Sequence, residues 1–160
     1  MDEEVPDGKG TMAAVLGMDA DQIDAVIEPI ANVTVANYNC PGQIVITGGT
    51  AGIEQASKAL KEAGAKRVVP LNVSGPFHSP MLRSAGEKLG KELLTVQLGE
   101  LKIPYVTNVT AEYVTDSSKI RELLTRQVYS PVRWEQSIRK MIAQGVDTFV
   151  EIGPGRTLTG

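Results

Sequence analysis

The stretch from Asn72 to Leu82, "NVSGPFHSPML", contains the only histidine of the 160-residue sequence, His78. Proline precedes it at Pro76 and follows it at Pro80, which restricts the backbone around the imidazole. An imidazole held in this way can serve as a general base, bind a metal or simply pack. A metal site is not expected, because the sequence has no second histidine, one cysteine and no acidic residue at ligand spacing nearby.

A histidine base needs a nucleophile, and the sequence does not supply a convincing one. Ser79 is adjacent to His78 but precedes Pro80 at a predicted helix start, where a serine side chain acts as the N-cap. Ser74 is the other nearby serine. No G-x-S-x-G pattern occurs, so the strained turn that exposes a catalytic serine is not expected in these 160 residues.

Residues 10–74 carry the pattern of a small α/β unit. Runs rich in β-branched residues predict four strands, within residues 10–18, 32–39, 43–48 and 66–74. Apolar residues at helical spacing predict two helices, over residues 19–31 and 51–65. The resulting β-α-β-β-α-β order is that of the ferredoxin-like fold.

Residues 75–160 have a different pattern of predicted helices and strands. Helices are predicted over residues 79–98, 117–129 and 130–145, and strands over residues 103–109 and 147–153. These elements look like part of a parallel α/β sheet, but two strands cannot form one alone, because a parallel sheet needs several neighbours and two covered faces. We therefore expect strands of this unit to be missing from the chain.

Composition excludes several classes of function. The net charge of −3 argues against nucleic-acid binding, which requires a basic face. A single cysteine rules out an internal disulfide and fits a cytoplasmic setting. The apolar runs are too short to cross a bilayer, and the first residues, "MDEEVPDGKG", lack a signal-peptide core. No membrane association is expected.

Several motifs in order resemble one enzyme family. They are "VANYNCPGQIVITG", "VSGPFHSPML", "IPYVTNVTA", "RQVYSPVRWEQSI" and "VEIGPGRTLTG". Over the whole chain the sequence resembles the malonyl-CoA:acyl carrier protein transacylases of fatty-acid synthesis and the related polyketide acyltransferase domains. The resemblance implies a ferredoxin-like small subdomain at 10–74, inserted in a larger α/β-hydrolase-like subdomain. Residues 1–9 would then be a remnant or linker of the larger subdomain, and residues 75–160 its C-terminal part.

The resemblance also implies what this chain lacks. The family begins with a "GQG" loop and the nucleophile elbow "GHSLGE", and neither occurs here. The family's substrate-binding arginine would lie just before Met1. We therefore expect a truncated chain that is inactive alone, and whose missing N-terminal segment is a required partner.

By the same resemblance, His78 is the general base and the main-chain carbonyl of Gln127 orients it. Phe77 would restrict the acyl group to malonyl, although a core aromatic is the alternative. Asn37, Asn39 and Asn108 would contact the substrate in the cleft, although turn support is an equal alternative for the first two.

The resemblance implies two substrates, malonyl-CoA and acyl carrier protein. The coenzyme A thioester and the phosphopantetheine group are therefore substrates, and no cofactor is expected.

Two other hypotheses remain from the residues alone. One is a ferredoxin-like module that binds a ligand or a partner protein without catalysis. The other is a fragment that pairs with a copy of itself through exposed sheet edges.

Overall fold

The first half of the chain folds as one antiparallel sheet covered by two helices. The computed structural model describes residues 10–73, 75–156 and 158, so the expectations for residues 1–9 and Ser74 fall outside it. The strands β1 (Gly10–Leu16), β2 (Val33–Cys40), β3 (Gln43–Gly49) and β4 (Arg67–Pro70) lie in the order β2-β3-β1-β4. The helices are α1 (Ala20–Ile27) and α2 (Thr50–Glu62). The element order predicted from the sequence is therefore confirmed.

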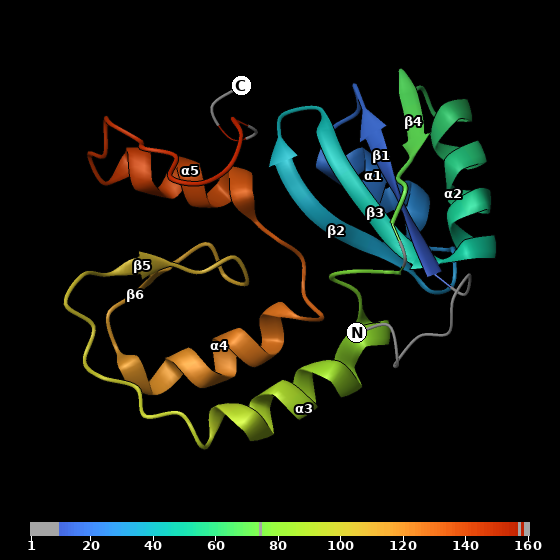
Figure 1. The fold of residues 1–160 in the computed structure, drawn as a ribbon. Coiled ribbons are helices and arrows are strands. Elements are labelled where there is room, and N and C mark those ends of the chain that lie inside the picture. Colours follow the sequence, from blue (N-terminus) through green and yellow to red (C-terminus); the bar gives the residue numbers. More distant parts are fainter. Residues whose placement is uncertain (1–9, 74, 157, 159–160) are drawn as a thin grey trace.

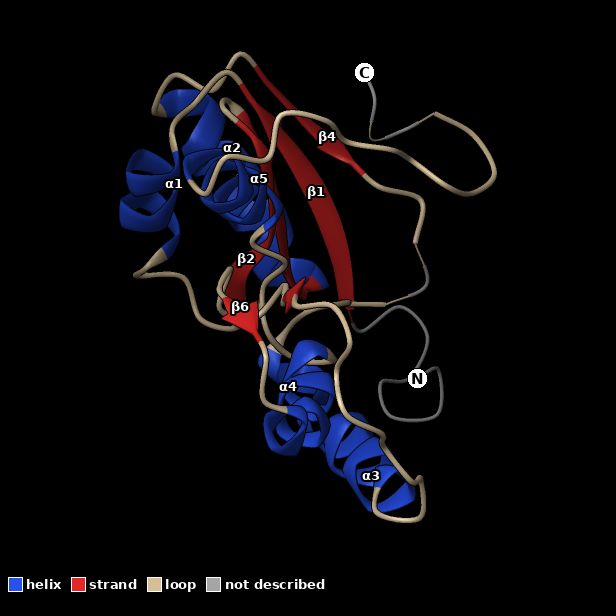
Figure 2. Ribbon diagram, turned by 90° about the vertical axis from the view of Figure 1, so that its left-hand side faces the viewer, coloured by secondary structure: helices blue, strands red, loops and turns tan. Residues whose placement is uncertain are grey.

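Both helices cover the same face of this sheet (Figures 1 and 2). The helical spacing explains why: α1 buries Ile23 and Ile27, and α2 buries Ile53, Ala56 and Leu60. These side chains form the main core with strand residues such as Val15 and Ile46. Asp19 is the N-cap of α1, and its N–H donates to Gln22 Oε1 at 3.3 Å.

The second half is mostly helical. It contains the short 3-10 helices η1 (Pro80–Leu82) and η2 (Ser117–Lys119), the helices α3 (Arg83–Leu93), α4 (Ile120–Gln127) and α5 (Trp134–Ala143), and a two-stranded sheet of β5 (Tyr105–Val106) and β6 (Tyr113–Val114). The α3–α4 pair extends away from the four-stranded sheet in both views (Figures 1 and 2). Of the helices that the structure describes, none combines the length and apolar character needed to cross a membrane.

Helix α5 begins at Trp134, later than the predicted start at Ser130. The intervening backbone pairs with β2 instead. Val132 N–H donates to Ala36 O at 2.7 Å, and Tyr38 N–H donates to Val132 O at 2.9 Å. Tertiary pairing with a strand edge thus takes precedence over the local Ser-Pro signal, and it ties the second half to the sheet.

Helices α3 and α4 pack against each other with no room for a side chain at Gly86. Gly86 of α3 is buried, and a Cβ built there would lie 2.6 Å from Tyr129 Cδ1 and 2.9 Å from Thr125 O. Arg121 of α4 fastens the other end, donating from Nε to Leu93 O at 2.9 Å and from Nη2 to Val96 O at 2.7 Å. The bond to Leu93 O adds to the one that this carbonyl accepts from Val96 N–H at 3.3 Å, and the bond to Val96 O holds the turn that follows α3.

Two strand predictions for the second half are wrong or too long. Only Tyr105–Val106 is a strand within residues 103–109, and the described part of 147–153 contains none. Several apolar residues of these segments face solvent, with Ile103 77% exposed, Val150 76% and Ile152 92%, whereas Val109 is buried. An isolated strand has no partner for its backbone groups, so an apolar extended segment without neighbours stays irregular.

We expect the substitution Gly86→Ala to destabilise the protein. The added methyl group would overlap Tyr129 and Thr125 O, and overpacking costs about 1–3 kcal/mol, more than the helix-propensity gain of about 1 kcal/mol. Urea unfolding followed by circular dichroism measures the change. The control is Gly99→Ala, whose Cβ would meet no atom within 4 Å and should change stability by less than about 0.5 kcal/mol. Equal midpoints for the two variants would contradict the packing argument.

Candidate functional site

His78 lies in a tight turn between the sheet and α3, in a backbone conformation that few side chains adopt. Its φ angle is 55°, in the left-handed region. The turn passes directly into η1, whose N-cap is Ser79 and whose first residue is Pro80, as the sequence predicted. The half-buried imidazole points its Nδ1 at the main-chain oxygen of Gln127, 3.2 Å away.

The Gln127 carbonyl is available because of where α4 ends. Gln127 is the last residue of α4, so its carbonyl belongs to the final turn, which has no helical N–H partner. A carbonyl oxygen can only accept a hydrogen bond, so this contact requires the proton on Nδ1. In the neutral imidazole the lone pair then lies on Nε2, which is the arrangement a general base needs.

A cavity of about 370 Å³ adjoins His78, and cationic groups line it together with the imidazole. Arg83 lies over the Tyr129 ring at 4.8 Å from its centroid, and Arg126 pairs with Glu122 at 3.2 Å. No local sequence signal pointed to Arg83 or Tyr129, because α3–α4 packing brings them together. Within residues 10–73, 75–156 and 158, no three histidine, cysteine or acidic side chains converge as a metal site would require.

The other predicted site residues do not line this cavity. Phe77 packs against the small core cluster of Met12, Ala36 and Val45, which favours its alternative interpretation as a core aromatic. Asn108 is half-buried, and its main-chain oxygen accepts from Arg133 N–H at 3.0 Å. Each therefore has a structural role in addition to any contact with substrate.

Asn37 and Asn39 do not lie on a regular strand. The pairing of β2 with β3 is irregular between Val35 and Asn37 and again between Tyr38 and Cys40, so strict alternation cannot be assumed between the two asparagines. Asn37 forms a parallel bridge with Val132, whereas Asn39 lines a different, larger cavity.

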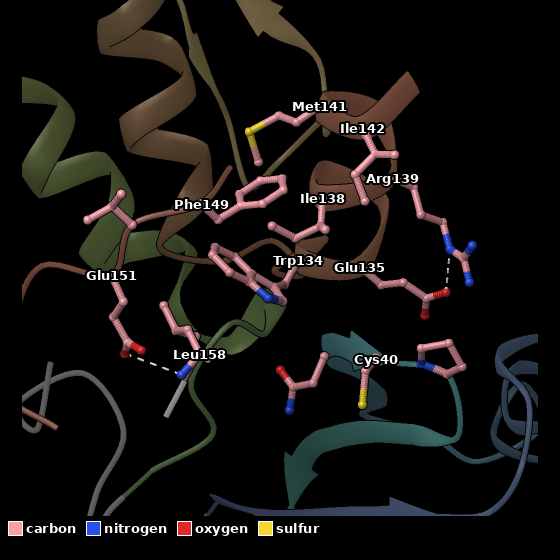
Figure 3. A pocket seen from close by; sticks show the side chains of 13 residues that line it. Cys40, Trp134, Glu135, Ile138, Arg139, Met141, Ile142, Phe149, Glu151 and Leu158 are labelled. Atoms are coloured by element: carbon pink, nitrogen blue, oxygen red, sulfur yellow. Dashed lines mark hydrogen bonds and ion pairs between the residues drawn. The ribbon is translucent and has the colours of Figure 1, made fainter. Parts of the chain in front are cut away.

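This larger cavity, of about 580 Å³, lies between the β2–β3 turn, α5 and the segment that follows α5. Figure 3 shows Trp134, Ile138 and Met141 of α5 facing Phe149, with Cys40 on the opposite side. Trp134, Ile138 and Met141 share one face of α5, since they are spaced at i, i+4 and i+7. They line an open, largely apolar cavity rather than a closed core.

A third group of polar residues lies where α1 meets β2. Burial raises the pKa of Asp24, and the neighbouring Asp21 carboxylate raises it further, while Arg133 opposes both. Burial likewise raises the pKa of Tyr38, whose ring lies 5.8 Å from the Arg133 guanidinium carbon. Arg133 thus links α1 and β2 to the start of α5 by electrostatic attraction.

The acyl transferase domain family matches residues 1–160. Since this match spans the whole chain, the chain belongs to that family. Two similar relatives are both named malonyl CoA-acyl carrier protein transacylase. The Bacillus subtilis (strain 168) protein is 50% identical over 164 residues, covering 100% of this chain and 52% of that protein. The Escherichia coli (strain K12) protein is 43% identical over 163 residues, and the match covers 100% of this chain and 53% of the Escherichia coli protein.

Solved structures give the same result. An acyl carrier protein S-malonyltransferase from Vibrio cholerae matches with a TM-score of 0.97 and 41% identity, over 99% of this chain and 53% of that one. A malonyl-transacylase in complex with a type II PKS acyl-carrier protein matches with a TM-score of 0.95 and 40% identity, over 99% and 52%. The chain therefore spans about half the length of these relatives.

We expect Gln127→Ala to leave the His78 imidazole unchanged, because the contact uses the main-chain oxygen that alanine retains. Nitrogen-15 NMR of the ring measures this directly, since His78 is the only histidine. The ring should keep its proton on Nδ1 in the variant. A change of tautomer would show that the Gln127 side chain, and not the carbonyl, holds the ring.

We expect Asp24→Asn to stabilise the protein slightly at pH 7, by less than about 1 kcal/mol for a largely exposed charge. Because the folded-state pKa of Asp24 is raised, its carboxylate costs stability above its folded-state pKa. That cost disappears as the pH falls below the unfolded value of about 4. Thermal unfolding of both proteins between pH 7 and pH 3.5 should show a difference that shrinks with pH. A difference that grows instead would contradict the assigned direction.

Proposed function

We propose that this chain supplies the general-base half of a malonyl-CoA:acyl carrier protein transacylase. The observation that carries the proposal is the 3.2 Å contact between His78 Nδ1 and Gln127 O, which leaves Nε2 as the basic nitrogen. The names of the two relatives, together with identities of 50% and 43% across the whole chain, support the same activity.

The proposed reaction has two halves. His78 Nε2 removes the proton of a serine hydroxyl, whose oxygen attacks the malonyl thioester carbonyl. The tetrahedral intermediate collapses, and the proton passes from the imidazolium to the departing coenzyme A thiolate. In the second half, the phosphopantetheine thiol of the carrier protein gives its proton to Nε2, and its sulfur attacks the malonyl-serine ester. The second tetrahedral intermediate collapses with cleavage of the bond to the serine oxygen, which takes the proton from the imidazolium and leaves malonyl on the carrier protein as a thioester. The coenzyme A thioester and the phosphopantetheine thiol are both substrates, and the proposed reaction uses no cofactor.

The serine must come from outside these 160 residues, because no G-x-S-x-G occurs among them. We assign residues 10–74 to a ferredoxin-like small subdomain and residues 75–160 to part of a larger α/β-hydrolase-like subdomain. The exposed apolar side chains of Phe149, Val150 and Ile152 support the second assignment, because a neighbouring strand would cover them. The substrate arginine would likewise belong to the covering polypeptide.

Substrate contacts belong to the proposal as well. Phe77, next to the base, would limit the acyl group to malonyl by bulk, and its packing on Met12 and Val45 would hold the ring still. Asn37, Asn39 and Asn108 are proposed to contact the acyl or pantetheine groups. A binding module without catalysis is the second candidate, favoured by the closed core of the four-stranded sheet.

The decisive experiment is malonyl transfer from coenzyme A to acyl carrier protein. We expect no transfer by this polypeptide alone, and recovery when the first half of the Bacillus subtilis relative is added as a separate chain. His78→Ala should then reduce the recovered rate by about 10²–10⁴-fold, the usual contribution of a general base.

The control for this assay is Gly99→Ala, which lies in open space and should retain the recovered rate. Turnover by the repurified chain alone would refute the missing-serine argument. Recovered activity that survives His78→Ala would refute the base assignment and leave the binding module as the better hypothesis.

A further inference from the structure

We propose that the Ser79 hydroxyl is a positioning group for the His78 imidazole. Ser79 is not a nucleophile here, because its Oγ is already engaged on both sides. The hydroxyl donates to Pro76 O at 2.7 Å and accepts from Met81 N–H at 3.3 Å. These two bonds connect the residues before and after His78 and close the turn in which it sits.

The closed turn explains the unusual backbone of His78. A φ of 55° is unfavourable for a residue with a side chain, and it persists only when the surroundings enforce it. Ser79 is 2% exposed, so water cannot replace its hydroxyl as a partner. Without the hydroxyl, the buried turn would lose the bond that joins Pro76 to the helix start, and His78 could relax to negative φ.

The turn is also anchored to the sheet. A Cβ built on Gly10, the first residue of β1, would lie 2.5 Å from Pro76 Cδ, so the proline ring packs directly on the strand. Ser79 therefore fixes the position of the imidazole relative to β1. The oxygen that accepts from the imidazole, Gln127 O, belongs to α4. A shift of the turn would move Nδ1 away from that oxygen, and the neutral ring would then exchange between its two tautomers.

The role assigned to Ser79 rests on the proposed function only in calling His78 a base, and it can be tested without any acyl transfer. Nitrogen-15 NMR of the imidazole reports one residue, because the sequence has a single histidine. We expect the proton of the neutral ring to reside on Nδ1 in the unsubstituted chain. In Ser79→Ala we expect this pattern to be lost, with resonances averaged between both tautomers.

Ser137→Ala is the matched control. Ser137 is also buried, at 3% exposure, and its Oγ also donates to a main-chain oxygen at 2.7 Å, that of Arg133. That substitution should lower stability to a similar extent and leave the His78 spectrum unchanged. A shift of the His78 signals equal to that of Ser79→Ala would mean general loosening and would overturn the proposal.

Two further outcomes would also overturn it. One is a wild-type tautomer pattern in folded Ser79→Ala, and the other is tautomer exchange in the unsubstituted chain. If circular dichroism shows that Ser79→Ala does not fold, the same NMR measurement on Ser79→Cys tests the proposal. A thiol has nearly the same shape and bonds only weakly, so the tautomer pattern should be partly lost, and an unchanged pattern counts against the role of Ser79. None of these results depends on the transfer assay, so the proposed activity and this inference fail separately.

Discussion

The bond between His78 Nδ1 and the Gln127 carbonyl joins two residues 49 positions apart, and the chemistry of the site depends on it. A carbonyl oxygen accepts but cannot donate or become charged at any working pH. It therefore fixes the tautomer of the imidazole without adding a titrating group. A carboxylate in the same place would also stabilise an imidazolium. Because the end of a helix holds the ring instead, the position of that helix becomes part of the geometry of the candidate site.

Packing against α3 helps to set the position of α4, and part of that contact, at Tyr129, lines the cavity that adjoins His78. Gly86 lets the Tyr129 ring and Thr125 O approach α3, and Arg121 bonds the last carbonyl of that helix, Leu93 O. His78 precedes α3 and Gln127 ends α4, so the two helices carry the donor and the acceptor of one bond. The packing of α3 against α4, through Gly86 and Arg121, therefore affects whether His78 Nδ1 can reach the Gln127 carbonyl.

The features that the sequence predicted correctly are those that depend on residues close together in the chain. Ser79 and Pro80 predicted a helix start because capping acts within a few residues, and helical spacing predicted the buried faces of α1 and α2. The pairing of His78 with Gln127 followed only from the resemblance to a family. The late start of α5 depends on pairing with β2, which is distant in sequence, and no local pattern predicted the irregularity of β2 near Asn39. The left-handed His78 lies in a turn closed by local Ser79 bonds, but residue types alone did not predict that φ.

The two halves of the chain also differ in how completely their backbone groups are satisfied. The four strands of the first half are adjacent to one another, so the sheet forms from local sequence and closes its own core. The residues around Val150 have the composition of a buried strand, yet within the described residues no strand pairs with them, and they stay irregular and largely exposed. Strand propensity alone does not make a strand. It becomes structure only where a second backbone supplies the hydrogen bonds and a second layer covers the side chains.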